Sequence, residues 1–150
     1  MKDIKRVHKH YVAVDGILGT AEADAKTPTS RNKWATIRDA NSQACFALLF
    51  AQFEDVVNTL CKRIVAKRKK LKKWEHRRSW DIIETSDIWR VSFMSRVALL
   101  TEKGKTDYNT VNQYYKLRCA IDHGSTASGI IVTTVANDLL GIATRMNCNV

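Results

Sequence analysis

The sequence predicts an all-α fold, an up-and-down bundle of about four to five helices. Apolar residues recur at helical spacing through most of the chain, and polar residues suited to capping precede several of these stripes. Of 150 residues, 45% are hydrophobic, which is enough for the core of a single domain spanning residues 1–150. Within it, we expect residues 1–40 to form an N-terminal helix and loop, and residues 41–150 the bundle core.

The N-terminal segment begins with a helix over residues 2–15, because Ile4, Val7 and Tyr11 lie on one stripe. This helix is expected to loosen at Gly16 and Gly19. Small and polar residues then dominate residues 20–33, which hold the only proline, Pro28. The sequence therefore predicts a long loop there.

The strongest helical pattern follows, with Asn41 or Ser42 as its cap. One face carries a continuous apolar stripe of Phe46, Leu49, Phe50, Phe53, Val57, Leu60 and Ile64. A stripe so wide needs partners on more than one side, so we expect this helix at the centre of the bundle. Glu54 is the acidic residue of this helix closest to that stripe.

After residue 78 the pattern predicts a short helical turn capped by Ser79, then a third bundle helix that starts at residues 85–87 and ends near Gly104. Its apolar residues are Ile88, Val91, Met94, Val97 and Leu99 or Leu100. Trp89 and Phe93 widen this side and are expected in the core rather than at a ligand.

Two more helices complete the prediction. The first begins at Thr106 or Asp107 and ends at Gly124, where a glycine suits a left-handed cap. A short loop of small residues leads to the last helix, over residues 131–146. Its first residues are β-branched and favour a strand by propensity, but the apolar stripe continuing to Met146 favours a helix.

Composition limits the possible environment and partners. No uninterrupted apolar run is long enough to span a bilayer, and the basic N-terminus is not followed by an apolar signal core, which predicts a cytoplasmic protein without membrane contact. The four cysteines show no C-x2-C spacing, so neither a zinc knuckle nor a dense disulfide framework is expected. The chain also has no Gly-rich phosphate loop of the Walker or dinucleotide type, and we expect no metal and no cofactor. A net charge of +10 favours a polyanionic partner, with nucleic acid as the first candidate.

The most basic part of the chain lies within residues 62–78 and is the predicted RNA-binding segment. Its phosphate-binding candidates, with one tryptophan that can stack on an unpaired base, are Lys67, Arg68, Lys69, Lys70, Lys72, Lys73, Trp74, Arg77 and Arg78. Like charges at this density also suit a merely solvated extension, and this alternative stays open.

The helix ending at Gly124 carries the sequence Tyr-Tyr-Lys-Leu-Arg-Cys-Ala-Ile-Asp-His over residues 114–123. Arg118 and His123 in this segment resemble the R-x4-6-H motif of the HEPN superfamily, small helical domains of which many are metal-independent ribonucleases. The resemblance covers roughly residues 40–147. It implies a HEPN-like bundle, a homodimer whose two motifs meet in one cleft, and a toxin or phage-defence effector with an antitoxin or other regulatory partner.

The resemblance assigns catalysis to Arg118 and His123. Cleavage of single-stranded RNA by its own 2′-hydroxyl needs an acid, a base and positive charge on the phosphate, which imidazole and guanidinium supply. Asp122, Glu54 and Cys119 are supporting candidates. Cys119 stands where the family usually has a polar residue, often Asn, which keeps open a non-catalytic module that binds RNA, nucleotide or protein. A helix-turn-helix-like DNA-binding domain is a third interpretation.

Overall fold

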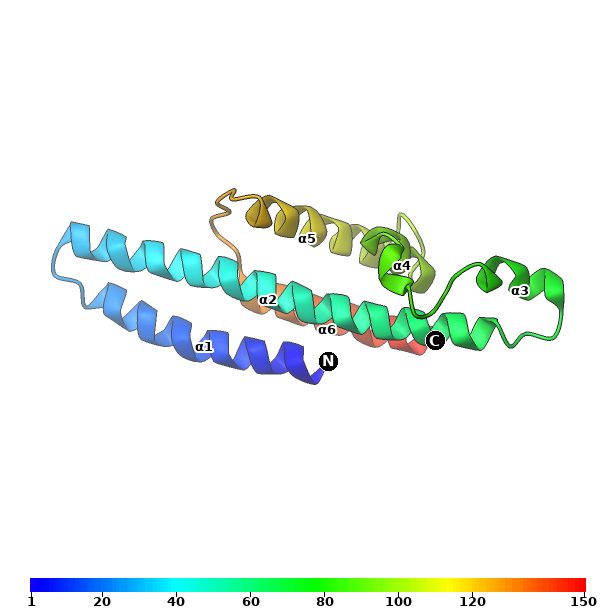
Figure 1. Cartoon of the computed structure of the whole chain (residues 1–150). Helices are drawn as coiled ribbons and strands as arrows, with labels where there is room; N and C mark the ends of the chain where they lie inside the picture. The colour runs from blue at the N-terminus through cyan, green and yellow to red at the C-terminus, as the bar shows by residue number, and fades with distance from the viewer.

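The computed structural model describes residues 1–150 and consists of helices alone, joined by loops and turns. The helices are α1 (Lys2–Ala23), α2 (Pro28–Arg68), α3 (Trp74–Asp81), the short 3-10 helix η1 (Ile88–Arg90), α4 (Phe93–Leu100), α5 (Thr106–Asp122) and α6 (Val132–Cys148). The predicted all-α bundle is confirmed. Figure 1 shows an elongated molecule in which α2 runs through the middle with α1, α5 and α6 along it.

The core gathers around the middle of α2, as its stripe predicts. Phe46, Phe50 and Phe53 are fully buried, and the ring of Phe50 packs edge-on against Phe93 of α4 with 5.2 Å between centroids. Tyr115 of α5 joins the same cluster, 5.1 Å from Phe93. Aromatic contacts thus tie α4 and α5 to one region of α2.

The N-terminal hairpin differs from the prediction, because α1 does not loosen at Gly16 and Gly19 but continues to Ala23. Arg38 of α2 explains this. Its guanidinium donates two hydrogen bonds of 3.0 Å to the carboxylate of Asp15 and one of 2.8 Å to Glu22. These bonds fix the second half of α1 along α2, and the two carboxylates raise the pKa of Arg38 above its usual value.

The predicted loop over residues 20–33 is wrong. Because α1 continues to Ala23 and α2 begins at Pro28, only residues 24–27 connect the two helices. Pro28 begins α2 instead of marking a loop, since the first helical turn needs no N–H from its first residue. The Thr27 hydroxyl caps this turn by accepting a 3.2 Å hydrogen bond from a backbone N–H.

Asn41 and Ser42 consequently lie inside α2 rather than at its start. Ser42 is buried, and its hydroxyl donates to the backbone oxygen of Arg38 at 3.0 Å. A polar pair that suits a helix cap thus lies in the interior of a helix of 41 residues.

The length and composition of α2 also bear on the expectation about membranes. By length and composition alone, α2 is long and apolar enough to cross a bilayer. The core helix of a soluble bundle meets the same criteria, and the buried side of α2 carries the hydrophobic core described above.

The segment between α2 and α5 is more broken than predicted. Ser79 does not start a helix but lies inside α3, and the expected third helix is split into η1 and α4. Ser92 begins α4 by accepting a hydrogen bond from the backbone N–H of Ser95. Phe93 is buried as expected, whereas the prediction for Trp89 is wrong: it is 62% exposed, with the Arg90 guanidinium over its ring.

The last two helices agree with the prediction, including helix rather than strand after residue 131. Gly124 has φ of +84°, and its N–H donates to Ile121 while that of Ser125 donates to Ala120, both at 2.9 Å. These two bonds form a Schellman cap, for which a glycine at this position is favoured. The cap ends α5 at His123.

Candidate functional site

Arg118 lies on α5 between two carboxylates. Its Nε lies 2.9 Å from Oδ2 of Asp122, one turn further along the same helix, and its Nη1 lies 3.6 Å from Oε2 of Glu54 on α2. The side chain of Arg118 remains 31% exposed. The structure thus brings three of the predicted site residues together and leaves part of the guanidinium open to solvent.

A second arginine, Arg96 of α4, completes this cluster and was missed in the sequence. Its Nη2 donates to Oε1 of Glu54 at 2.9 Å and its Nη1 donates to the side-chain oxygen of Asn58, while the guanidinium lies over the ring of Phe93. Only 6% of its side chain is exposed. The signal was present, since Arg96 stands three residues after Phe93 and four before Leu100, at the spacing of the buried apolar residues of α4.

Tyr115 and Cys119 form the wall of the cluster on α5, one helical turn apart. A hydrogen bond with Cys119 raises the pKa of the Tyr115 phenol, the negative charge of Glu54 adds to the rise, and Arg118 opposes it. Cys119 is half-buried and forms no disulfide. Cys119 therefore lies next to the cluster, with the phenol of Tyr115 as its partner.

His123 lies at the end of α5, outside this cluster. Its backbone N–H donates to Cys119, and the Schellman cap at Gly124 directs the chain away immediately afterwards. The side chain is exposed and makes no hydrogen bond or ion pair within the chain. Since five helical positions correspond to about 140° of rotation, Arg118 and His123 point to different sides of α5.

Contacts with α6 hold α5 in place at its start and at its middle. Tyr114 donates a 2.5 Å hydrogen bond to Asp138, and burial together with that carboxylate raises the pKa of the phenol. Arg145 donates two hydrogen bonds of 2.8 Å to Asp107 at the start of α5. The motif helix therefore has a defined orientation on the bundle.

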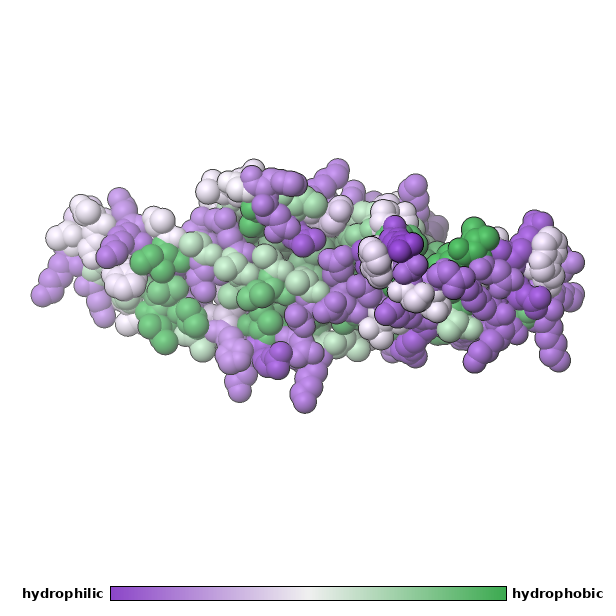
Figure 2. Space-filling model, in the orientation of Figure 1, coloured by the Kyte–Doolittle hydropathy of each residue, from purple (hydrophilic) through white to green (hydrophobic).

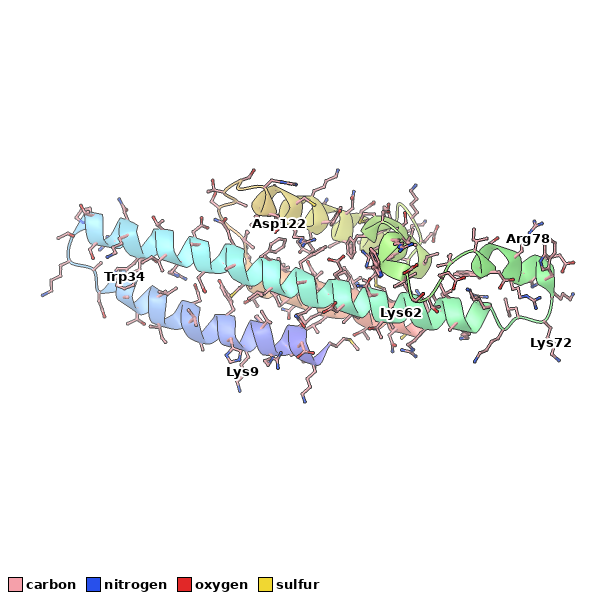
Figure 3. The ribbon with its side chains drawn as sticks, viewed as in Figure 1. Lys9, Trp34, Lys62, Lys72, Arg78 and Asp122 are labelled. Carbon is pink, nitrogen blue, oxygen red and sulfur yellow. The ribbon has the colours of Figure 1, made fainter.

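The predicted RNA-binding segment lies at the other end of the molecule. It covers the end of α2, the connection over residues 69–73 and α3, where Figure 2 shows a largely hydrophilic surface. In Figure 3 Lys72 and Arg78 lie at the tip beside α3, far from Asp122 near the end of α5. The structure does not bring the two predicted parts of an RNA site together within one chain.

Several cations of that segment have partners in the chain. Arg77 contacts Asp81 at 3.3 Å, Lys69 lies 3.8 Å from Glu84, and Arg68 lies over the ring of Trp80. Lys67 donates to the backbone oxygen of Val150. Lys70, Lys72 and Lys73 are exposed and form no ion pair, and Trp74 is 57% exposed with Arg78 over its ring.

No group of three or more His, Cys, Asp or Glu side chains is arranged to hold a metal ion. Comparisons with family models, with curated proteins and with solved structures found no match for this chain. The family of the chain is thus not shown, and its function has to be argued from the geometry of the site.

Proposed function

We propose that the chain is a metal-independent endoribonuclease of HEPN type that cleaves single-stranded RNA by attack of the 2′-hydroxyl. The observation that supports this best is the end of α5. There the Gly124 cap leaves the imidazole of His123 in solvent, while Glu54 and Asp122 hold the guanidinium of Arg118 one turn earlier, still one-third exposed.

The two residues then have distinct roles. The imidazole of His123 can serve as base or acid, so it takes the proton of the 2′-hydroxyl or gives one to the departing 5′-oxygen. The guanidinium of Arg118 stays charged and presents a planar fork to the phosphate oxygens, where negative charge develops. The products are a 2′,3′-cyclic phosphate and a free 5′-hydroxyl, which balances protons without a metal.

A second copy of the chain supplies what one chain lacks. Arg118 and His123 point to different sides of one helix, so two motif helices that cross at a two-fold axis are needed to bring Arg and His groups to one phosphate. We therefore propose a homodimer, cytoplasmic, that acts as a toxin or phage-defence effector under an antitoxin or other regulator. A net charge of +10 supports RNA as its substrate.

His123→Ala tests the assignment, with His10→Ala as a matched control because both imidazoles are exposed and His10 lies on α1, outside the predicted site. A labelled single-stranded RNA is incubated with each variant in EDTA. We expect His123→Ala to lose at least about a hundredfold in rate, as removal of a general acid or base does, and His10→Ala to cleave normally. Equal cleavage by the two variants would refute the role of His123.

A non-catalytic binding module is the second candidate, and one observation favours it. Arg118 is already held by two carboxylates, and a cysteine follows it where the family usually has a polar residue. Such a module binds RNA, nucleotide or protein without turnover. Two results together would establish this alternative. The wild type never cleaves RNA, and the substitutions Arg118→Ala and His123→Ala leave the affinity for RNA unchanged.

A further inference from the structure

Glu54 bridges two arginines of different helices. Each of its carboxylate oxygens faces one guanidinium: Oε1 accepts from Arg96 of α4 at 2.9 Å, and Oε2 lies 3.6 Å from Arg118 of α5. With Asp122 on the other side of Arg118, two cations and two anions alternate in a row and their charges cancel. Each charged group thus has at least one neighbour of opposite charge.

The two arginines differ in how firmly Glu54 holds them. Arg96 is 6% exposed, donates at a normal hydrogen-bond distance and has a further acceptor in Asn58. Arg118 is 31% exposed, and 3.6 Å is longer than a hydrogen bond. Arg96 is therefore the permanent partner of Glu54, and Arg118 is the partner that can leave.

We infer that Arg96 is a positioning residue: as the buried countercharge of Glu54, it lets Arg118 exchange Glu54 for a phosphate oxygen. A carboxylate that is three-quarters buried is destabilised when its only cation departs, so a lone Glu54–Arg118 pair would retain Arg118. With Arg96 in place, Glu54 keeps a cation throughout the exchange. This inference rests on the proposed function in its assignment of the phosphate to Arg118.

Stability alone does not account for Arg96. A buried ion pair is often no more stabilising than apolar side chains of the same volume. The Nε of Arg96 is moreover buried without any hydrogen-bond partner, which is an unfavourable feature of this site. Arg96 is thus kept at some cost in stability beside Glu54, the carboxylate that also contacts Arg118.

The first test measures Arg118 directly, by the ¹⁵N relaxation of its Nε–H group in solution without ligand. Arg96→Met leaves Glu54 with Arg118 as its only cation, so the Arg118 side chain should become more rigid. Glu54→Gln added to Arg96→Met removes the acceptor charge and should make Arg118 more mobile than in the wild type. Arg145→Met, which breaks an ion pair at the opposite end of α5, should leave the signal unchanged.

The second test measures cleavage of single-stranded RNA by the same variants. We expect Arg96→Met to lower the cleavage rate by about tenfold or more, because Arg118 then stays bound to Glu54 by one charge-assisted hydrogen bond. Glu54→Gln in that background should restore the rate. Damage to the fold would not be repaired by removing a second charge.

Unchanged Arg118 relaxation in Arg96→Met would overturn the inference even if the wild type cleaves RNA. Another combination of results also distinguishes the role of Arg96 from the ribonuclease proposal. If Arg118 becomes rigid in Arg96→Met and mobile in the double variant, but the wild type neither cleaves nor binds RNA, the role of Arg96 toward Arg118 stands and the ribonuclease proposal fails.

Discussion

Glu54 of α2 lies 3.6 Å from Arg118 of α5, across the interface between the central helix and the motif helix. This contact joins residues that are 64 positions apart and belong to separate parts of the predicted site. It makes the orientation of the candidate catalytic arginine depend on the packing of the bundle, and it leads to predictions about stability as well as about cleavage.

The ion pair between Arg96 and Glu54 predicts that substitutions at the two residues have non-additive effects on stability. Glu54→Gln leaves the buried Arg96 charge without its carboxylate and should lower the free energy of unfolding by about 3 kcal/mol. Arg96→Met should cost less, because Glu54 retains Arg118. The double variant should be more stable than Glu54→Gln alone. Urea denaturation measures all three, and simple additivity would show that the two side chains do not interact.

Two glycines, one in the cap after α5 and one inside α1, predict opposite effects of the same substitution. Gly124→Ala places a side chain at φ of +84° and should destabilise the fold by about 1–2 kcal/mol, loosening the end of α5 that carries His123. Gly16→Ala lies inside α1 with open space around it and should stabilise by about 0.5–1 kcal/mol. Thermal unfolding measures both, and a stabilising Gly124→Ala would contradict the cap.

Exposed lysines at the α3 end predict how RNA binding depends on salt. Neutralising Lys70, Lys72 and Lys73 should weaken binding of an uncleavable 2′-deoxy oligonucleotide. The slope of log affinity against log salt should flatten by up to about one unit for each phosphate that a lysine no longer neutralises. Lys2, Lys5 and Lys9 of α1 are also exposed and provide a control of equal charge. Equal weakening in both triple variants would show that only net charge matters.

The ion pair between Asp107 and Arg145 predicts a pH-dependent contribution to stability. Hydrogen bonds from Arg145 lower the pKa of Asp107 below its usual value, so the pair stabilises the fold above the unfolded-state pKa near 4 and loses its effect as the pH falls through the folded-state value. Because Arg145 is 59% exposed, Asp107→Asn should cost less than about 1 kcal/mol at pH 7. The difference from wild type should shrink as the pH falls through the folded-state pKa of Asp107 and vanish once the carboxyl is protonated in both states.

Predictions from the sequence were most reliable where apolar spacing and a glycine cap agreed. The stripe through Phe46, Phe50 and Phe53, and the end of α5 at Gly124, are both found as expected. These features depend on local backbone geometry, which apolar spacing and capping residues predict without knowledge of tertiary contacts.

Features that depend on tertiary partners were not predictable from local signals. Gly16 and Gly19 favour a break in α1, but the Arg38 bridge to Asp15 and Glu22 keeps the helix intact. Arg96 is a charged residue in a buried position, where local patterning predicts an apolar one, and only the placement of Glu54 opposite it explains its burial. Trp89 stands in apolar spacing but is exposed, and it is the preceding residue, Ile88, that η1 buries in the core.

The direct test of the ribonuclease proposal is mass spectrometry of the ends of single-stranded RNA after incubation with wild-type protein in EDTA. We expect new fragments that end in a 2′,3′-cyclic phosphate, with partner fragments that begin with a 5′-hydroxyl, and their absence with His123→Ala. RNA that remains intact, or fragments that carry a 5′-phosphate, would contradict the proposal.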